Sequence, residues 1–337
     1  MKASVLTNYG SPDFFKLTEV ENPTPGDDEV LVKVVGASVN SWDWEIMMGK
    51  PFVNRMMFGI FKPAMPILGA DMAGRVEAVG KNIQQFKPGD EVYGDMSGCG
   101  WGGFAEYVCA PEHALVLKPA SLTFEQAAAV PQAALLALQA VRDKGQVQPG
   151  QKVLINGAGG GAGTFALQMA KYFGAEVTGV DSTEKLDIMR SNGADHVIDY
   201  TQHDFTRNGL RYDQIVDMAT THSIFDCIRA LSPRGTYVVV GGPTAGIFQV
   251  MLLGSWMARI ENKKMGLLLH KANKGLADLK ALFETGKVVP VIDRCYPLSA
   301  VADAIRYFDE GHAKGKIVIT VEHAAIHERS IRLRHLL

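Results

Sequence analysis

The fold is decided by the stretch KVLINGAGGGAGTFALQMAKYFGAEVTGVD, residues 152–181. Residues 153–155 form an apolar run typical of a buried strand, and a glycine-rich loop follows them directly. The loop opens a run of helical periodicity that continues to about Phe173, and a second apolar run then ends at Asp181. Strand, loop, helix and strand within about 30 residues match the size of one βαβ unit. The stretch therefore predicts a parallel sheet covered by helices.

The loop itself contains only glycine and alanine. Missing side chains let the backbone approach a pyrophosphate, and the amides at the start of the following helix stabilise its negative charge. The alternative is an ordinary flexible turn, which the surrounding strands, helix and terminal acid disfavour. We predict that the loop binds the pyrophosphate of a nicotinamide dinucleotide. The predicted binding residues are Gly157, Ala158, Gly159, Gly160, Gly161, Ala162 and Gly163.

Outward from this unit, the strand and helix pattern continues. Further apolar runs lie at 196–198, 214–216 and 237–240, with helical periodicity between most of them. The last run is followed by Gly241, Gly242 and Pro243. Because ligands gather at the carboxyl ends of parallel strands, we predict that these three residues hold the nicotinamide side. A simple β-turn is the alternative.

The two ends of the chain have a different pattern. The first third alternates short β-branched runs with glycines, at 29–35, 72–79, 91–93 and 104–108, which predicts a small barrel or rolled sheet. Near residue 290 the pattern changes again, with a helix expected over 299–310 and a last strand over 316–321.

A second change in character occurs near residue 121. Thr123 and Gln126 fit the ends of a capping box, and the Ala- and Leu-rich run after them predicts one helix to about Lys144. This helix marks the transition from the barrel pattern to the strand and helix pattern.

Length and composition narrow the class of protein. The chain has 337 residues, 34 Lys or Arg against 36 Asp or Glu, and four cysteines. The length fits two domains. Nucleic-acid-binding proteins usually have an excess of basic residues, which this chain lacks. Four cysteines are too few to cross-link a secreted fold of this size by disulfide bonds. No apolar run reaches the roughly 20 residues of a membrane span. We therefore expect a cytoplasmic protein with no nucleic-acid or membrane partner.

These motifs resemble the medium-chain dehydrogenase/reductase superfamily, in particular its zinc-free quinone oxidoreductase (zeta-crystallin-like) branch. The resemblance covers about residues 1–321. It implies an α/β fold in which a GroES-like β-barrel substrate domain, residues 1–121 completed by 290–337, flanks a Rossmann NAD(P)-binding domain with a doubly wound parallel sheet, residues 122–289. The motifs that carry it are GQKVLINGAGGGAG (150–163), KPGDEV (87–92), GFAEY (103–107), GAD (193–195) and GKIV (315–318).

The resemblance also raises the question of a metal. Zinc-carrying members have an early cysteine and a later Gly-His-Glu, and here Asn40 and Ala70 stand at the places of the cysteine and the histidine. Asparagine and alanine cannot replace a thiolate and an imidazole on zinc. The structural zinc site needs four closely spaced cysteines, and only Cys99 and Cys109 occur there. We predict no zinc, which favours substrates that are already electrophilic over alcohols.

The residues after the second strand give conflicting indications about the cofactor. Asp181 can bind the ribose 2′-hydroxyl and repel a 2′-phosphate, which favours NADH. In the resembling branch a Ser-Thr pair, a Lys and a Tyr hold the 2′-phosphate, and Ser182, Thr183, Lys185 and Tyr200 match them. The branch usually uses NADPH, which we favour over NADH. For Lys185, a solvated helix position is the alternative.

No motif identifies an acid or a base on the substrate side. The resembling branch places a substrate-side asparagine at Asn40, whose amide can donate to a substrate carbonyl or contact the nicotinamide. A turn residue that caps local backbone is the alternative. Asp43 is the other candidate, and it can also simply orient Asn40 or cap a helix. The apolar stretches 53–68 and 247–257 are candidates to line a substrate pocket, with core packing or a subunit interface as alternatives.

The functional hypothesis is an NAD(P)H-dependent reductase of quinones or α,β-unsaturated carbonyls. Two alternatives stay open: a dehydrogenase of another carbonyl or an alcohol, and a non-catalytic nicotinamide-nucleotide-binding protein with a sensing or structural role. The expected partner is a small electrophilic molecule, and a homodimer is left open. Residues 322–337 lie beyond the resembling pattern, and either a frayed end or a segment packed on the barrel or a neighbouring subunit fits them.

Overall fold

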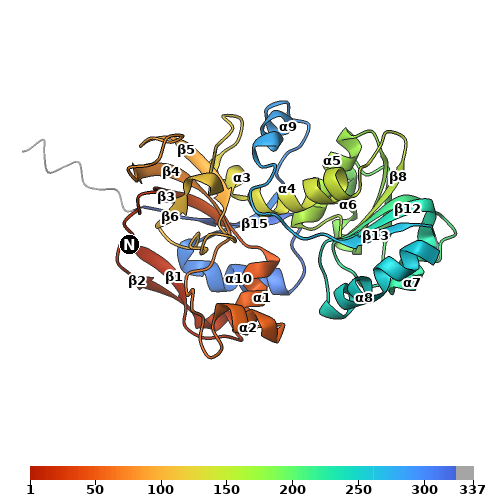
Figure 1. Ribbon diagram of the computed structural model, residues 1–337, viewed down its shortest axis with the longest axis horizontal. Coiled ribbons are helices and arrows are strands. Elements are labelled where there is room, and N and C mark those ends of the chain that lie inside the picture. The colour runs from red at the N-terminus through yellow and green to blue at the C-terminus, as the bar shows by residue number, and fades with distance from the viewer. Residues whose placement is uncertain (261, 324–337) are drawn as a thin grey trace, which may run out of the picture.

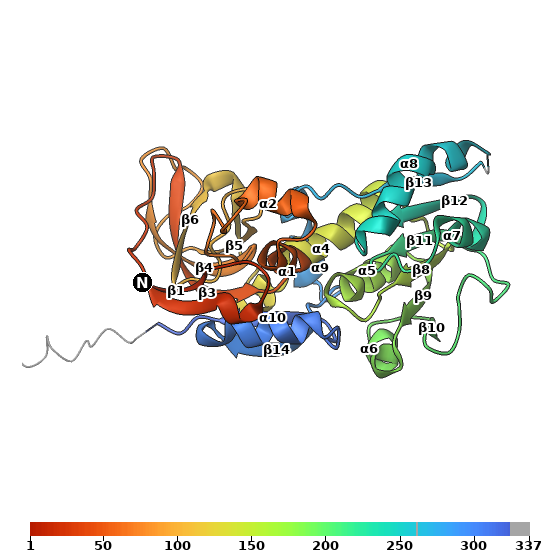
Figure 2. The same ribbon diagram turned by 90° about the horizontal axis from the view of Figure 1, so that it is seen from below.

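The stretch 152–181 forms the centre of a parallel sheet in the computed structural model, which describes residues 1–260 and 262–323. The six strands, all labelled in Figure 2, lie in the order β10-β9-β8-β11-β12-β13, so the chain order reverses beside β8. All neighbouring strands pair in parallel. This doubly wound arrangement confirms the predicted Rossmann fold. The strands are β8 (Lys152–Asn156), β9 (Glu176–Asp181), β10 (His196–Asp199), β11 (Tyr212–Asp217), β12 (Leu231–Val239) and β13 (Lys264–Leu267).

Helices cover both faces of this sheet because the central strands are apolar on both sides. Val153 and Ile155 pack in one core cluster with Phe165 of α5, whereas Leu154 packs in another with Ile224 of α7. A parallel sheet buried on both faces needs such continuous apolar strands. The helices are α5 (Gly161–Tyr172), α6 (Leu186–Ser191), α7 (Ile224–Ala230) and α8 (Thr244–Ile260), whereas α9 (Lys280–Glu284) packs on α5 through Phe283 and Phe165.

A second sheet is built from the two ends of the chain. Its order is β14-β15-β3-β4-β5-β7, and β6 pairs with β3, while β1 and β2 form a separate pair. This rolled sheet confirms the expected barrel half. Its elements are β1 (Lys2–Leu6), β2 (Phe15–Glu19), β3 (Glu29–Ser38), α1 (Ser41–Met48), α2 (Phe52–Phe58), β4 (Asp71–Val79), β5 (Glu91–Asp95), β6 (Tyr107–Pro111) and β7 (Val116–Leu117).

One predicted strand of this half is displaced. The run expected at 104–108 gives a strand only from Tyr107. The backbone of Phe104 bonds to Ser4 and Leu68, and the N–H of Glu106 donates to the carbonyl of Lys2. These bonds tie residues 104–106 to the N-terminal strand and to Leu68, and the only contact of this kind with β3 among the described residues is the N–H of Val34, which donates to the carbonyl of Glu106 at 3.0 Å.

The C-terminal part of the chain returns to the barrel half. β15 (Lys316–Thr320) pairs antiparallel with β3 and parallel with β14 (Ile292–Pro297), and α10 (Val301–Asp309) connects the two. Figure 2 shows α10 and β14 beneath the barrel strands. The helix and last strand occur as expected, but β14 was not predicted, because its sequence IDRCYP has no regular apolar alternation. The choice between a frayed end and a packed segment for residues 322–337 concerns residues that, from 324 onward, lie outside the described part of the chain.

The single helix expected between residues 123 and 144 is divided into three pieces. The capping box is confirmed, since Gln126 N–H donates to Thr123 Oγ1 at 3.2 Å and Thr123 N–H donates to Gln126 Oε1 at 3.0 Å. Pro131, which lacks an N–H, then starts a new helix. In Figures 1 and 2 this new helix lies between the two halves of the molecule. The pieces are α3 (Phe124–Ala128), α4 (Pro131–Leu138) and a π-helical turn (Gln139–Lys144).

No helix in residues 1–260 and 262–323 is both long enough and apolar enough to cross a membrane.

Candidate active site

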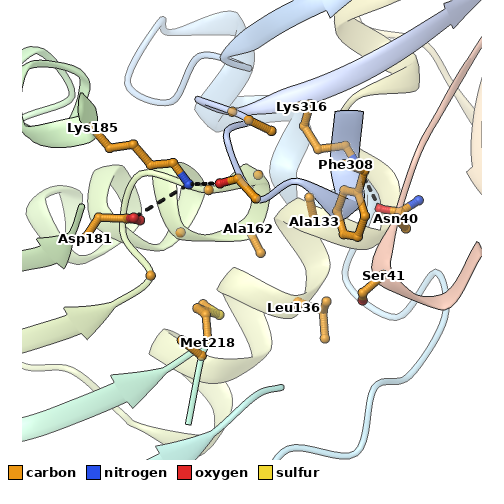
Figure 3. Close-up of a pocket in the computed structure, with 18 of the residues that line it drawn as sticks. Asn40, Ser41, Ala133, Leu136, Ala162, Asp181, Lys185, Met218, Phe308 and Lys316 are labelled. Carbon is orange, nitrogen blue, oxygen red and sulfur yellow. Dashed lines mark hydrogen bonds and ion pairs between the residues drawn. The ribbon is translucent and has the colours of Figure 1, made fainter. Parts of the chain in front are cut away.

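A cavity of about 600 Å³ lies between the two halves of the molecule. Its walls come from the turn after β3, from α4, from the glycine loop, from the loop after β11 and from the segment that leads into β15. Figure 3 shows Asp181 and Lys185 at one end, Asn40 and Lys316 at the other, and apolar side chains between them. The cavity therefore joins the predicted nucleotide site to the predicted substrate site.

The glycine loop forms the wall at the start of α5. Gly157 has a φ of +83°, which favours glycine, and a Cβ on Gly163 would overlap the carbonyl oxygen of Gly157. The loop can therefore turn sharply and keep the helix close to the strand. The first N–H groups of a helix have no partner within it, and Gly161, Ala162 and Gly163, which begin α5, line the cavity.

The remaining loop residues divide between the wall and the layer behind it. Gly157 and Gly160 line the cavity, whereas Ala158 and Gly159 are not among the lining residues. The N–H of Ala158 donates to the carbonyl of Val180, and the N–H of Gly159 donates to Asp181 Oδ2 at 2.9 Å. These two residues hold the loop against β9, so their direct contact with a cofactor stays a prediction.

Asp181 and Lys185 form a buried pair at the nucleotide end. Lys185 Nζ lies 3.6 Å from Asp181 Oδ1 and donates to the carbonyl oxygen of Gly311 at 2.8 Å. The alternative of a solvated Lys185 is therefore wrong, because only 8% of the residue is exposed. Beside this pair, His312 Nδ1 lies 3.0 Å from Glu184 Oε1. The contacts of Lys185 with Gly311 and of Glu184 with His312 join the Rossmann half to the segment before β15.

The other predicted ribose-site residues are divided. Tyr200 lines the cavity and is more than half exposed. Ser182 and Thr183 do not line it: the N–H of Ser182 donates to Asp181 Oδ1 at 2.9 Å, and the hydroxyl of Thr183 donates to Asp199. A role of these two residues in binding a 2′-phosphate stays a prediction.

The loop after β12 lies behind the cavity wall. Gly241, Gly242 and Pro243 are absent from the lining, which here comes from the loop after β11, residues 218–222. A Cβ on Gly242 would overlap the carbonyl oxygen of Ala219, so this glycine permits close packing of the two loops. Contact of the three residues with the nicotinamide stays a prediction. The described lining also includes no residue of the apolar stretches 53–68 and 247–257, so their role in a substrate pocket stays a prediction.

A buried hydrogen-bond network closes the opposite end of the cavity. Asn40 Nδ2 donates to Asp71 Oδ2 at 3.0 Å and to the Ser38 carbonyl at 3.4 Å, and Asn40 Oδ1 accepts from Lys316 Nζ at 2.5 Å. Asp71 also accepts from the Ser38 hydroxyl at 2.9 Å and from the backbone N–H of Gln132 at 2.8 Å. Both donors of the Asn40 amide are thus engaged. Donation to a substrate, as predicted from the sequence, would require one of these bonds to break.

The network contains a buried ion pair. Lys316 Nζ lies 3.5 Å from Asp71 Oδ2 and also donates to the carbonyl of Val39 at 3.0 Å. Burial raises the pKa of Asp71 and lowers the pKa of Lys316, and the opposite charge of each partner counteracts these shifts. Three donors on the carboxylate and two oxygen acceptors on the ammonium favour the charged forms.

Asp43 lies behind this network and outside the cavity lining. It is fully buried, and its two oxygens accept from the N–H groups of Asn40 at 2.8 Å and Gly69 at 2.9 Å. It therefore fixes the start of α1 and orients Asn40. These contacts fit a positioning residue, and its catalytic role stays a prediction.

Asp43 gives a prediction for the pH dependence of stability. Burial raises the pKa of Asp43 to about 7, against the lowering effect of the two N–H donors. The folded state then holds this proton up to about pH 7, whereas the unfolded state releases it near its ordinary value of 3.8. The free energy of unfolding should therefore fall as pH rises from about 4 to 7, by up to about 1.4 kcal/mol per pH unit.

Urea unfolding of Asp43→Asn at several pH values checks this prediction. In the variant, the free energy of unfolding should no longer fall with pH by the amount that Asp43 contributes. The variant should also be less stable overall, because one N–H loses its acceptor. The exposed Asp309 gives the matched control Asp309→Asn, whose slope should equal that of the wild type. Equal slopes for the wild type and Asp43→Asn would contradict the assignment.

Sequence reasoning missed three residues of the substrate end: Asp71, Gln132 and Lys316. Lys316 stands in the GKIV motif, and its only local sign is a charged residue at the start of an apolar strand. Gln132 follows Pro131 in an otherwise apolar helix, where a polar residue on a buried helix is a usable signal. Among the described residues, no group of three or more His, Cys, Asp or Glu side chains could hold a metal ion. The zinc-free state stays a prediction.

Two protein-family models match the chain. The alcohol dehydrogenase GroES-like domain matches residues 26–120, and the zinc-binding dehydrogenase model matches residues 192–319. The second range does not contain Asn40 or Ala70, so its description says nothing about those positions.

Curated relatives and solved structures agree with these models. The chain is 34% identical to 2-methylene-furan-3-one reductase from Solanum lycopersicum, over 95% of this chain and 79% of the relative. It is 32% identical to the human quinone oxidoreductase, over 95% and 97% of the two chains. The structure of the quinone oxidoreductase from Coxiella burnetii superposes with a TM-score of 0.85 at 30% identity, covering 96% of this chain and 99% of the other.

Proposed function

Since the chain belongs to the medium-chain dehydrogenase/reductase superfamily, in its quinone oxidoreductase branch, we propose that it is an NAD(P)H-dependent reductase that transfers a hydride to a quinone or an α,β-unsaturated carbonyl. The observation that carries the proposal is one continuous cavity between the two halves. It joins the start of α5, suited to a pyrophosphate, to a buried polar network about Asn40 and Lys316.

The residues of the nucleotide end fit a nicotinamide dinucleotide. Gly161, Ala162 and Gly163 present the start of α5 to the cavity, and Asp181 lies at the end of β9, where a ribose is expected. When bound, the nicotinamide supplies the hydride. The chain contributes the alignment of the two reactants and the removal of water.

The middle of the cavity is suited to that task. Its wall includes Ala133 and Leu136 of α4, Met218 after β11 and Phe308 of α10 (Figure 3). These apolar side chains exclude water from the path between the nucleotide end and the substrate end. A dry environment strengthens the interaction of nearby donors with the negative charge that develops on a carbonyl oxygen.

The substrate end does not fit a zinc ion. Ala70 offers no ligand atom, and Asn40 Oδ1 already accepts a hydrogen bond from the Lys316 ammonium. A carboxamide oxygen bound to an ammonium is a poor zinc ligand, because zinc prefers thiolate, imidazole and carboxylate. We therefore derive no step of the reaction through a metal.

The decay of NADPH and NADH absorbance with a panel of acceptors tests the proposal. A benzoquinone, an alkyl vinyl ketone and an alkenal represent the proposed substrates, and an aliphatic ketone represents another carbonyl. Oxidation of the cofactor by the conjugated acceptors, with little reaction of the aliphatic ketone, is the expected result. Tight cofactor binding without turnover of any acceptor would contradict it.

For the cofactor we propose NADPH, supported by a relative named NADPH-dependent alkenal/one oxidoreductase from Arabidopsis thaliana. Asp181 and Lys185 act on this choice in opposite directions. Asp181→Ser removes a charge that repels a 2′-phosphate, and Lys185→Ala removes a charge that attracts it. We expect Asp181→Ser to raise the ratio of kcat/KM for NADPH over NADH by roughly 5- to 30-fold, and Lys185→Ala to lower it by a similar factor.

Steady-state kinetics with both cofactors measures this ratio. Arg211→Ala, a charge change at an exposed residue outside the cavity lining, is the control and should leave the ratio unchanged. If Asp181→Ser and Lys185→Ala both keep the wild-type ratio of kcat/KM values, other residues recognise the ribose.

We propose the cytoplasm as the location. The support is chemical: Cys99, Cys109, Cys227 and Cys295 are all free, as expected in a reducing compartment. Some relatives are named as chloroplastic enzymes. A localisation experiment that finds the protein in such an organelle would contradict the proposal.

A further inference from the structure

At the substrate end, most polar atoms of the buried network already have partners. The amide of Asn40 is bonded to Lys316, Asp71 and the carbonyl of Ser38. The carboxylate of Asp71 receives three donors in addition to its ion pair. This network therefore has little free capacity to bind a substrate oxygen.

Among the described residues that line the cavity, Gln132 is the exception. Its residue is only 3% exposed, and Nε2 of its side chain has no hydrogen-bond partner in the part of the chain that the structure describes. An amide nitrogen left unpaired in the interior is unfavourable, so an unpaired one next to a cavity calls for an explanation. Its backbone N–H, by contrast, is held by Asp71 Oδ1 at 2.8 Å, which fixes the position of the residue.

The place of Gln132 points to a ligand. It lines the cavity beside Asn40 and Ser41, and its neighbours on the same helix, Ala133 and Leu136, are apolar. It is the second residue of α4, so the positive end of that helix lies beside its amide. As placed, Nε2 is buried, and a half-turn about the Cγ–Cδ bond would exchange the two ends of the amide, so that the nitrogen faces the cavity and Oε1 takes its place.

We propose that the side-chain amide of Gln132 binds the carbonyl oxygen of the substrate. This inference rests on the proposed reductase function and identifies the donor that the reaction uses. The amide N–H becomes paired when the substrate enters, and its bond strengthens as hydride transfer places negative charge on the oxygen. Sequence reasoning assigned this role to Asn40, whose donors are already engaged.

The charges at this end also select the class of substrate. Asp71 and Asp95 are fully buried, and they face one buried ammonium, Lys316, and one histidine, His270, whose Nε2 lies 2.6 Å from Asp95 Oδ2. A further anion here would be repelled by the carboxylates. We therefore expect a neutral quinone, enone or enal, rather than an unsaturated carboxylate.

The test replaces Gln132 with methionine, which keeps the chain length and removes both the donor and the acceptor. With a neutral enone, kcat/KM should fall roughly 10- to 100-fold. The Kd for NADPH, from a fluorescence titration, should change less than about two-fold, because the amide contacts substrate and not nucleotide. The Tm should stay equal or rise, because an unpaired buried amide is removed. A merely structural glutamine would instead lower the Tm.

Gln139→Met is the matched control. Gln139 is equally buried, but its amide bonds to the backbone of Lys271 and Lys274. This variant should lower the Tm and leave kcat/KM with the enone nearly unchanged. If Gln132→Met does not fold, Gln132→Leu provides the same loss of the donor in a helix-forming side chain.

The possible outcomes separate three claims: the reductase function, the role of Gln132 and the class of substrate. If none of the tested acceptors causes the wild-type protein to oxidise NADPH, the proposed function is overturned. An active wild type whose kcat/KM is within two-fold of that of Gln132→Met overturns the role of Gln132 and leaves the reductase function intact. A preference of the wild type for an unsaturated carboxylate over the matched neutral enone overturns the substrate class.

Discussion

Replacement of Lys316 with methionine is expected to destabilise the folded protein by about 3–5 kcal/mol, the usual effect of removing one partner of a buried ion pair. Lys316 is the buried ammonium that faces Asp71, and its Nζ also holds Asn40 Oδ1 and the carbonyl of Val39. Without it, the Asp71 charge is left in the interior with hydrogen bonds alone. Urea unfolding at neutral pH, with Tm as a second measure, gives the loss.

A double-mutant cycle assigns the effect to charge. Lys316→Met combined with Asp71→Asn removes both charges, and the pair should recover about 1–3 kcal/mol relative to Lys316→Met alone. Lys287, which is exposed, provides the control Lys287→Met, expected to change stability by less than about 0.5 kcal/mol. A double variant no more stable than Lys316→Met would show that the loss comes from packing of the side chain rather than from the uncompensated carboxylate.

Replacement of Gly160 with aspartate is expected to weaken NADPH binding by roughly 100-fold or more, the loss of about two hydrogen bonds to a charged group. Gly160 is the N-cap of α5, with a φ of −84°, and a Cβ there would lie 3.5 Å from the carbonyl oxygen of Gly157. The backbone therefore accepts a side chain without strain. An aspartate at an N-cap accepts the first N–H groups of the helix, so its carboxylate would occupy the place we assign to the pyrophosphate and repel it.

Stability gives this prediction its control. Because aspartate is a favoured N-cap residue, Gly160→Asp should keep or raise the Tm while binding is lost. Gly160→Ala adds the Cβ without the charge and should bind NADPH within a few-fold of the wild type. Binding is measured by fluorescence titration or calorimetry. If Gly160→Asp binds NADPH with wild-type affinity, the pyrophosphate does not bind at the start of α5.

The Rossmann half could be predicted because its determining features are local. The strand, the glycine loop and the helix within residues 152–181 are contiguous, and the two strands of this unit pair directly with each other, as Val153 does with Val177. The same holds for the capping box at Thr123, which the structure confirms. Where the local pattern is ambiguous, as in the Ala-rich run after it, one residue without an N–H, Pro131, decides where the helix is divided.

The substrate end could not be predicted in the same way, because its contacts are distant in sequence. Lys316 Nζ and Asn40 Oδ1 are 276 residues apart along the chain. Asn40 itself was identified, but its role as a predicted donor depended on free N–H groups, and the network with Asp71 is visible only in three dimensions. Lys185 is a similar case: a lysine after an apolar strand gives no sign of the carbonyl of Gly311 that binds it.

The return of the last strand to the barrel has a consequence for synthesis. A ribosome delivers the chain from its N-terminus, so β3 and β4 leave the exit tunnel long before β15 is made. Until then Asp71 has no ammonium to neutralise it, and the edge of β3 that β15 later covers is unpaired. A translation product that stops before Lys316 thus carries a complete glycine loop but an unstable barrel. Such a product should be removed by proteases instead of persisting as a nucleotide-binding fragment that competes for the cofactor.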